Sequence, residues 1–274
     1  MAISLLNNIT ALEAENQVNQ TDSSLQNVLV QLSSGSRLNS GADDPAGLSI
    51  ADSLQANITE LNQAANNANT GIGLLQTADG SLGQVTNLLD RAITIATEAA
   101  NGGLSASQMQ ALDNEFTSIK AEIDRIGGQT TFNSSSVFVG GTTSIFLGSA
   151  ANSIGVSISN LSSSWLGLSG AMLYDGSDTS TADAAAALTA ITTAVSTVAQ
   201  DRGNIGATLN RLTDAQNVIT NQVTNLTSAE NLIRSADIPQ DVTEEAQYSV
   251  LEQTGISALT QANQSTQNIL RLFQ

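Results

Sequence analysis

Acidic residue pairs are the groups in this chain that could do chemistry. Asp43 and Asp44 could act as paired carboxylates, and the stretch "DGSD" (175–178) is similar to the start of a calcium-binding loop. The pair stands directly before "PAGLSIA". Because Asp favours the N-cap of a helix and Pro its first turn, we interpret the pair as a helix start. "DGSD" lacks the alternating acids, the glycine placement and the closing glutamate of a calcium loop, so we interpret it as a solvated loop.

The composition removes most other catalytic chemistry. The sequence contains no histidine and no cysteine. Without histidine, the usual general base and the usual zinc ligand are missing, and Ser–His and Cys–His nucleophile arrangements are excluded. Without cysteine there is neither a disulfide framework nor thiolate chemistry. We therefore expect no catalytic residues, no cofactor and no metal ion, and a protein that is not an enzyme.

Charge and hydropathy limit the partners. The 274 residues carry a formal net charge of −17, with eight basic residues of which Lys120 is the only lysine. This argues against nucleic acid and against anionic membrane surfaces. We find no stretch of about 18 apolar residues and expect no membrane span. The start, "MAISLLNNITALEAENQ", has no basic region and no small-residue cleavage site, so it is not a conventional secretory signal.

The strongest pattern in the sequence is an apolar repeat that predicts long helices. Between Leu54 and Ala100 the apolar residues alternate spacings of four and three, interrupted only by Asp79 and Thr86. A second repeat of nearly the same length covers 188–233. Repeats of this length indicate a coiled coil rather than the helix of a compact domain. At about 1.5 Å per residue each rod would be roughly 65–70 Å long, so we expect antiparallel or bundle partners.

Shorter elements lie between and outside the rods. Residues 109–126 repeat the three–four spacing in a shorter helix. The segment 130–176 changes to an alternation of Ile and Val with Ser and Gly, which predicts one or two β-hairpins. Residues 3–33 and 256–273 again show helical spacing. We therefore predict a mainly α fold of long antiparallel coiled-coil or bundle rods, with a small β-hairpin region and helices at both ends.

Several longer stretches resemble the signatures of one family, bacterial flagellin. In the first half these are "LSSGSRLNSGADDPAGLSIADSL" (32–54), "ANNANTGIGLLQTADGSLGQVTNLLDRA" (65–92) and "EIDRIGGQTTFN" (122–133). In the second half they are "NLTSAENLI" (225–233) and "LTQANQSTQNIL" (259–270). The stretches occur in the order and spacing of the family, so the chain is identified as similar to flagellin at both ends.

The resemblance implies a filament subunit whose two ends pair as a coiled coil in the filament core. Residues 1–43 and 234–274 would form this inner domain, and residues 44–130 and 180–233 the helical rod domain. Residues 131–179 would be the β-hairpin and loop region of the rod domain. Because this segment is short, the outer variable domains of the family are expected to be absent or vestigial.

The resemblance also implies the partners and the location. The chain would form an open helical homopolymer, the extracellular flagellar filament used for swimming, after export without a cleaved signal peptide. A flagellar export chaperone, the secretion apparatus, the filament cap and the hook-junction proteins are the further partners implied. Two alternatives stay open: a hook–filament junction protein, which shares both terminal signatures, and a secreted coiled-coil effector or adhesin. The intact "SSGSRLNSGADDPAGLSIA" favours the filament subunit.

The apolar ends predict self-assembly on physical grounds as well. Each end is a thin apolar stripe on a polar helix, too sparse to offset backbone ordering of about 1–2 kcal/mol per residue. We therefore expect both ends to be largely disordered in the free monomer and to become helical on assembly, where neighbouring copies cover the stripes. A head-to-tail contact that does not close gives an open helical polymer. The predicted polymerisation residues are Leu5, Ile9, Leu12, Leu25, Leu29, Leu32, Ile256, Leu259, Leu270 and Phe273.

One further site is implied by the resemblance alone. Flagellins of many motile bacteria are recognised by a vertebrate Toll-like receptor through a patch on the long rod. The matching stretch, "LDRAITIATEAANG" (89–102), keeps Arg91, and Glu115 aligns with an acid of the family. Ile93 and Thr94 replace an arginine and a glutamate of the usual motif. The resemblance therefore implies a weakened innate-receptor patch at Arg91 and Glu115, and the alternative is that Arg91 is a solvated rod residue.

Overall fold

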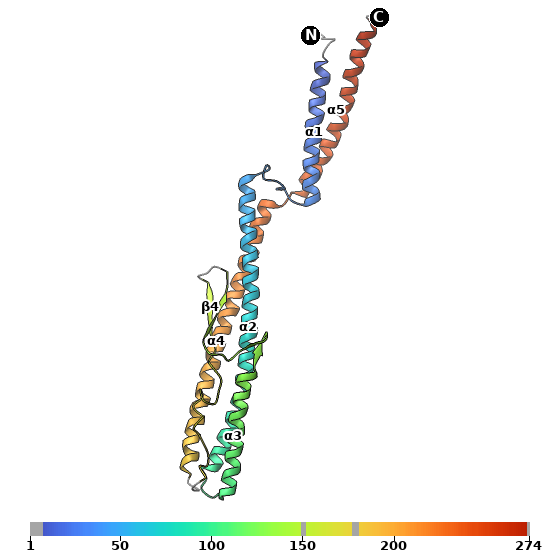
Figure 1. Cartoon of the computed structure of the whole chain (residues 1–274). Helices are drawn as coiled ribbons and strands as arrows, with labels where there is room; N and C mark the ends of the chain where they lie inside the picture. Colours follow the sequence, from blue (N-terminus) through green and yellow to red (C-terminus); the bar gives the residue numbers. More distant parts are fainter. Residues whose placement is uncertain (1–7, 149–151, 177–180, 273–274) are drawn as a thin grey trace. The chain divides into compact units, whose positions relative to one another are not determined.

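The computed structural model describes residues 8–148, 152–176 and 181–272 (Figure 1). Within these residues the chain forms five α-helices and four short β-strands, which confirms the predicted mainly α fold. In chain order the elements are α1 (Ile9–Ser34), α2 (Pro45–Ala99), α3 (Ala106–Gln129), β1 (Thr131–Phe132), β2 (Ser135–Ser136), β3 (Thr142–Phe146), β4 (Ser153–Ser157), α4 (Ala182–Arg234) and α5 (Ile238–Leu272).

The chain divides into two compact units. The terminal unit contains the described residues up to Ile58 and from Thr224 onward, and the rod unit runs from Thr59 to Val223. The dividing points fall inside α2 and α4, so each of these long helices contributes to both units. The domain boundaries expected from the sequence stay a prediction.

Side chains that bind backbone groups determine where α2 begins. Asp44 Oδ1 accepts hydrogen bonds from the backbone N–H of Ala46 (3.1 Å) and of Gly47 (2.9 Å), and Pro45 is the first helical residue. Asp43 Oδ2 accepts from the backbone N–H of Ser40 at 2.8 Å. Both carboxylates therefore bind backbone groups, and the interpretation of the acidic pair as a helix start is confirmed.

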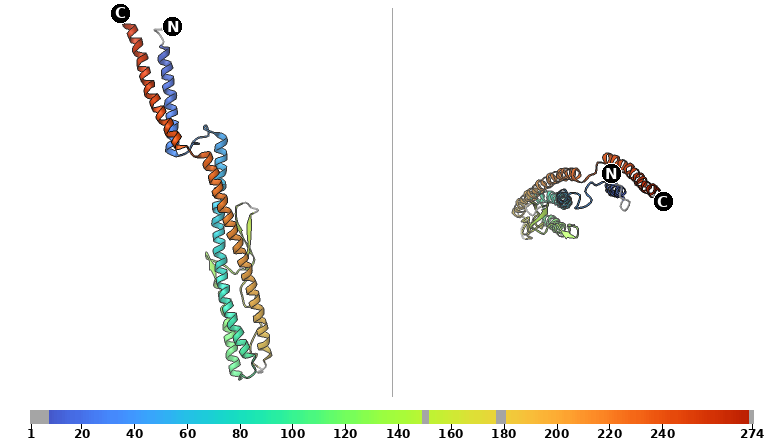
Figure 2. Two further views of the ribbon diagram at one scale, coloured as in Figure 1. Left: turned by 180° about the vertical axis from the view of Figure 1, so that it is seen from behind. Right: turned by 90° about the horizontal axis from the view of Figure 1, so that it is seen from above.

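Helices α2, α3 and α4 surround the core of the rod unit (Figures 1 and 2). Fully buried large side chains come from all three helices, among them Leu75, Phe116 and Ile191. Both predicted apolar repeats have the right extent, because each of their positions is buried or half-buried. Positions 109–126 form the predicted third helix within α3.

The buried face of α2 is rotated relative to the predicted seam. Predicted positions such as Ile72, Thr86 and Ile93 are only half-buried and lie at its edge. Helix α2 packs into a core that it shares with α3, α4 and the irregular segment 158–176. It therefore needs a wider buried face than a helix of a two-stranded coiled coil. The buried positions of α2 within the rod unit, which combine the predicted row with its neighbours, are 64, 68, 71, 75, 78, 82, 85, 89, 92, 95, 96 and 99.

Polar side chains of α2 and α4 pair with each other across the rod unit. Arg202 of α4 donates from Nε to Asp79 Oδ1 of α2 at 2.8 Å and from Nη2 to Oδ2 at 3.3 Å. Further along, Gln216 Nε2 donates to Asn69 Oδ1 at 3.0 Å. As the residue number falls from Asp79 to Asn69, that of the partner rises, so the two helices are antiparallel in a register that these contacts specify.

Two antiparallel hairpins follow α3, as the sequence predicts. In the first, β1 pairs with β2 through a turn in which Asn133 and Ser134 have φ of 49° and 64°. In the second, β3 pairs with β4, with Ile145 opposite Ile154. The expected alternation is confirmed, because the alternating side chains of Ile154, Val156 and Ile158 are buried. The second hairpin lies close to α2, where a Cβ at Gly71 would be 3.0 Å from Ile145 Cγ1.

The residues between β4 and α4 form an irregular segment, 158–176, which we call the strap. Its leucines close the core of the rod unit, and polar residues of α3 hold its backbone. Asp124 accepts from the backbone N–H of Ser163 at 2.7 Å, and Asp113 accepts from that of Leu173 at 2.7 Å. Lys120 Nζ donates to the carbonyl oxygen of Ala171 at 2.7 Å. The buried leucines of the strap are Leu161, Leu166, Leu168 and Leu173.

Helix α4 corrects one sequence-based expectation. It is the one helix among the described residues that is long and apolar enough by composition to cross a membrane, although we expected no such stretch. Alanines, rather than large aliphatic residues, supply much of this apolar character, so the sequence shows no continuous run of large apolar residues there. Its buried positions include Ile191, Ala194 and Val198, which belong to the core of the rod unit.

Candidate assembly surface

Helices α1 and α5 lie side by side and antiparallel in the terminal unit (Figure 1). Asn8, which precedes α1, donates from Nδ2 to the carbonyl oxygen of Ala262 at 3.2 Å. Further along, α5 approaches α1 closely at Gly255, where a Cβ would lie 2.7 Å from Val18 Cγ2. A residue with no side chain therefore allows the two helices to meet.

The face of α1 that is buried in this pair repeats with spacings of three and four. Its members are small or aliphatic apart from Thr21, whose hydroxyl donates to the carbonyl oxygen of Gln17 at 2.9 Å. Only Thr21 and Val28 are fully buried, so the face is shallow. The buried and half-buried members are Ala11, Ala14, Val18, Thr21, Leu25, Val28 and Leu32.

The matching face of α5 is mostly polar. It places acidic residues where a coiled coil usually has apolar ones. Asp241 is 8% exposed, and its Oδ2 has no hydrogen-bond partner among the described residues. The pair thus has little apolar surface between its two helices. The buried and half-buried members of this face, at spacings of four and three, are Asp241, Glu245, Tyr248, Glu252, Gly255, Leu259 and Ala262.

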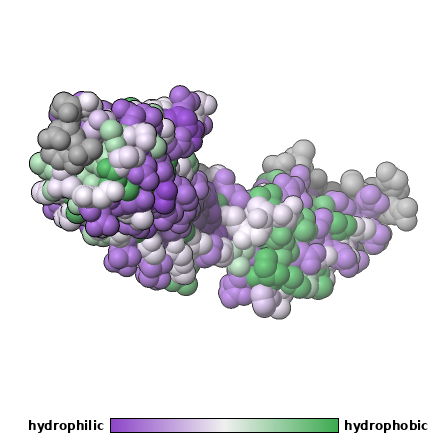
Figure 3. All heavy atoms as spheres, turned by 90° about the horizontal axis from the view of Figure 1, so that it is seen from below, coloured by the Kyte–Doolittle hydropathy of each residue, from purple (hydrophilic) through white to green (hydrophobic). Residues whose placement is uncertain are grey.

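Large apolar side chains instead point away from the pair. Leu12 is 58% exposed on α1, and Val250 is 59% exposed on α5. Figure 3 shows apolar side chains gathered on this part of the molecule. Large apolar side chains that are exposed together on one part of a protein indicate an interaction surface. The exposed apolar residues of the two helices are Ile9, Leu12, Leu29, Val30, Ile238, Val242, Val250, Leu251 and Ile256.

The predicted polymerisation residues fall into three groups. Four are exposed on the helix pair: Ile9, Leu12, Leu29 and Ile256. Three are half-buried on the inner faces: Leu25, Leu32 and Leu259. Leu5 and Phe273 lie outside the described residues, as does the side chain of Leu270.

Sequence reasoning missed five exposed apolar residues on the same two helices: Val30, Ile238, Val242, Val250 and Leu251. A helical wheel with two apolar directions rather than one could have found them. The sequence of one helix alone, however, does not show which of its two apolar faces contacts the partner helix.

Backbone pairing fixes the root of the helix pair within the terminal unit. Ser36 and Ser235 form an antiparallel bridge, in which the N–H of Arg37 donates to the carbonyl oxygen of Arg234 at 2.7 Å. The Arg234 guanidinium also binds Glu230 at 3.0 Å. Charge-assisted hydrogen bonds of this kind hold a guanidinium in a defined orientation. The segments that lead out of α1 and into α5 are therefore held against each other.

The two residues of the implied receptor patch lie together on the rod unit. Arg91 Nε donates to Glu115 Oε1 at 2.7 Å, and the two side chains are 55% and 39% exposed. This hydrogen bond raises the pKa of the Arg91 guanidinium. The arrangement is a surface ion pair between α2 and α3 that a partner could reach.

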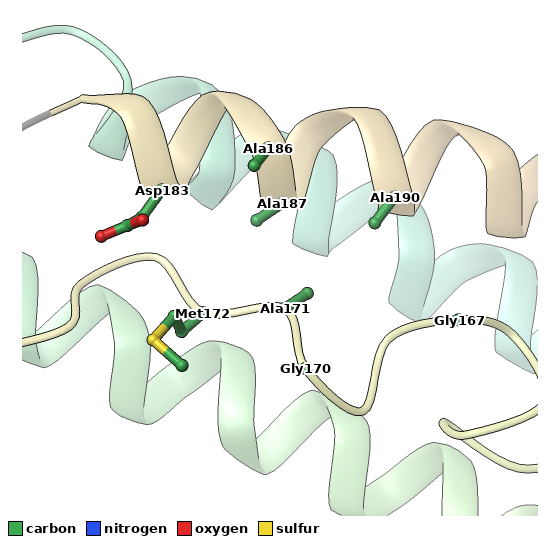
Figure 4. A pocket seen from close by; sticks show the side chains of 8 residues that line it. All are labelled: Gly167, Gly170, Ala171, Met172, Asp183, Ala186, Ala187 and Ala190. Carbon is green, nitrogen blue, oxygen red and sulfur yellow. The ribbon is translucent and has the colours of Figure 1, made fainter.

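A shallow pocket lies between the strap and the first turns of α4 (Figure 4). Glycine and alanine make up most of its wall, and Asp183 is the one titratable side chain that lines it. Figure 4 shows Met172 and Asp183 at one end and the small side chain of Ala171 toward α4. The other described residues that line the pocket are glycines, alanines and Met172, so its wall offers little polar chemistry besides the Asp183 carboxylate.

Comparison with known proteins identifies the family. The pattern described as the bacterial flagellin N-terminal helical region matches residues 5–143, and that of the C-terminal helical region matches residues 188–273. The flagellin of Bacillus subtilis (strain 168) is 31% identical over 300 residues, covering 97% of this chain and 98% of the relative. The flagellin of Halalkalibacterium halodurans is 32% identical over 267 residues, again covering 97% and 98%.

A crystal structure of Bacillus cereus flagellin is also similar, with 30% identity and a TM-score of 0.49, covering 60% of this chain and 94% of that one. From the two family patterns and the nearly full-length relatives, we conclude that the chain belongs to the bacterial flagellin family, whose members are structural proteins that polymerise into the extracellular flagellar filament for motility.

Proposed function

We propose that this flagellin polymerises through the outward apolar faces of α1 and α5. One observation carries the proposal: in the described part of the terminal unit, α5 turns acidic side chains toward α1, while large apolar side chains of both helices are exposed on the outside of the pair. Burying a large aliphatic side chain contributes about 1.5–3 kcal/mol. Further copies of the chain would supply the cover that this single chain does not.

The same surface explains why assembly and helix formation should be coupled. Helices α1 and α5 together contain 61 residues, from 26 and 35, and ordering each residue costs about 1–2 kcal/mol. The shallow face between them offers few large apolar contacts in return. We therefore expect circular dichroism to show less helix in dilute monomer than in filaments, and equal helicity in both would contradict this coupling.

Substitution of an outward residue tests the interface. Leu12 is 58% exposed, so assembly can bury about half of its side chain, worth on the order of 1.4 kcal/mol. Leu12→Ser should therefore raise the critical concentration for filament formation about tenfold. The measurement is sedimentation of reassembled full-length protein, with negative-stain microscopy of the pellet.

Gln17→Ser is the matched control, because Gln17 is an exposed polar residue of the same helix. It should leave the critical concentration unchanged. If Leu12→Ser assembled as readily as this control, the outward face of α1 would not be the polymerisation interface. The thermal unfolding of the rod unit should be the same in both variants, since neither residue belongs to it.

The remaining partners are proposals that follow from the family. An export chaperone would cover the apolar residues of α5 before secretion, and the secretion apparatus would export the chain without cleaving a signal peptide. The filament cap and hook-junction proteins would contact the same terminal helices. Binding of a purified chaperone to the full chain, but not to an Ile256→Ser and Val250→Ser double variant, tests the first of these.

The Arg91–Glu115 pair is proposed as the innate-receptor patch. Its support is geometric: both groups are exposed and joined at 2.7 Å, so a receptor can contact them as one unit. Arg125 is similarly exposed and also forms an ion pair on the rod unit, so Arg125→Ala is the control. Loss of receptor signalling in Arg91→Ala, with unchanged signalling by Arg125→Ala, would support the patch. Equal signalling by all three proteins would leave Arg91 as a solvated rod residue.

The alternatives are not favoured. The relatives matched over nearly their full length are flagellins rather than junction proteins, effectors or adhesins. Flagellins are structural proteins, and we propose that this one has no catalytic activity. The net charge of −17 supports the further proposal that nucleic acids and anionic membranes are not partners.

A further inference from the structure

The turn between α2 and α3 contains the one Asn–Gly dipeptide of the sequence, Asn101–Gly102. Helix α2 ends at Ala99, and both residues of the dipeptide are exposed. Gly102 has a φ of 59°, a left-handed conformation that glycine adopts without steric cost. The dipeptide therefore lies in an open turn outside both helices.

The two groups that must react with each other are unengaged. The side-chain amide of Asn101 and the backbone N–H of Gly102 have no hydrogen-bond partner among the described residues. Only the backbone N–H of Asn101 is bound, to the carbonyl oxygen of Glu98 at 3.1 Å. Because Gly102 has no Cβ, nothing on that residue obstructs approach of its nitrogen to the Asn101 side chain. We propose that Asn101 is a site of spontaneous deamidation in the assembled filament.

The reaction is balanced with water as its co-reactant. The Gly102 nitrogen attacks Cγ of Asn101 and loses its proton, and the side-chain nitrogen leaves as ammonia. The new N–Cγ bond closes a five-membered succinimide. Water then adds to one of the two ring carbonyls and breaks one C–N bond, which gives either aspartate or isoaspartate at position 101. No oxidant, reductant or enzyme is needed.

Other asparagines of the chain lack this combination of features. Asn114 lies inside α3, and its Oδ1 accepts from Gln110 Nε2 at 3.3 Å. Asn39 donates from Nδ2 to the carbonyl oxygen of Ser36 at 2.7 Å. The helix or the hydrogen bond keeps these amides from the geometry that ring closure requires. We therefore expect Asn101 to react before they do.

The product places a new negative charge at an unfavourable point. It adds a carboxylate just beyond the C-terminus of α2, where the helix dipole is negative, and three residues from Glu98. Isoaspartate also adds one methylene to the backbone of the turn. The formal net charge moves one unit beyond −17 with each event. A filament would thus accumulate charge at this turn as it ages.

Peptide mapping of aged full-length protein tests the proposal. Trypsin, which cleaves after Arg and Lys, releases residues 92–120, a peptide that contains both Asn101 and Asn114. Incubation at mildly alkaline pH should add about 1 Da at Asn101, the difference between an amide and an acid, and leave Asn114 unchanged. Isoaspartate should also be detected by enzymatic methylation. No gain at Asn101, or an earlier gain at Asn114, would overturn the proposal.

Two variants and one comparison sharpen the test. Asn101→Gln should abolish the mass gain, because ring closure from the longer side chain is much slower. Gly103→Ala keeps the dipeptide, and its new Cβ would come no closer than 3.9 Å to the Asn101 carbonyl oxygen, so its gain should match the parent chain. Assembled filaments should show the same gain as monomer. Reaction in the monomer but not in filaments would refute the filament site.

Discussion

Gly127 in α3 tests how closely the strap packs on the rod unit. Gly127 is buried, and a Cβ there would lie 2.9 Å from the carbonyl carbon of Leu161 and closer still to its oxygen. Real Cβ contacts essentially never fall below 3.0 Å, and a backbone carbonyl cannot rotate away as a side-chain tip can. Gly127→Ala must therefore move the backbone at Leu161, a residue that is 3% exposed.

The expected magnitude is a balance of two effects. Displacing a buried leucine and overpacking its site costs about 1–3 kcal/mol. Replacing a helical glycine by alanine gains about 0.5–1 kcal/mol. We therefore expect Gly127→Ala to lower the free energy of unfolding by about 1–2 kcal/mol. For a unit of this size that lowers the melting temperature by about 2–8 °C.

The next residue provides the control. Gly128 is also in α3, but a Cβ there would have no heavy atom within 4 Å. Gly128→Ala should therefore stabilise the protein slightly, by at most about 1 kcal/mol. The assay is thermal and urea unfolding of both full-length variants, followed by circular dichroism. If Gly127→Ala proved as stable as Gly128→Ala, the close packing of the strap on α3 would be wrong.

Three further predictions concern the rod unit. Ser134 holds a φ of 64° in the β1–β2 turn, so Ser134→Gly should raise the free energy of unfolding by about 1 kcal/mol in urea unfolding; a loss would contradict the turn geometry. A double-mutant cycle of Asp79→Asn and Arg202→Gln should give a coupling of about 0.5 kcal/mol, because the pair is more than a third exposed, and zero coupling would remove its role in register. The hydrogen bond from Arg125 lowers the pKa of the Glu122 carboxyl group. The stabilisation from this pair is therefore fully present above the ordinary carboxyl pKa, and it is lost as the pH falls through the lowered pKa of Glu122. NMR titration of Arg125→Gln should show that pKa rising, and an unchanged pKa would refute this.

The helices and their pairing were open to prediction from the sequence because a long repeat carries redundant information. Asp79 stands out as a charged residue in the first repeat, and Arg202 stands out in the same way in the second. A polar group within an apolar seam needs a partner, and two opposite charges at corresponding heights specify an antiparallel register. The structure joins these two residues at 2.8 Å. The antiparallel pairing of α2 and α4 could therefore have been predicted from Asp79 and Arg202 as well as from the apolar repeats.

The strap could not be predicted in the same way. It has no periodicity, and its position depends on single contacts to α3, such as those of Asp113, Lys120 and Asp124 with its backbone. Because every residue type carries a backbone carbonyl and all but proline carry an N–H, the sequence does not show which backbone groups of the strap will bind side chains of α3. Only the presence of polar residues along α3 was visible beforehand, and polar residues on a helix are usually solvated.

The assembly surface marks a second limit of sequence reasoning. The same three–four spacing occurs in both units, but its physical outcome differs. In the rod unit it leads to side chains such as Leu75 and Phe116, which are completely buried within one chain. In the terminal unit it leaves Leu12 and Val250 more than half exposed, while acids such as Glu252 lie between the helices. A periodic apolar stripe therefore establishes that a helix face must be covered. It does not say whether the cover comes from the same chain, and only the geometry of the partner helix separates Leu25, which faces inward, from Leu12.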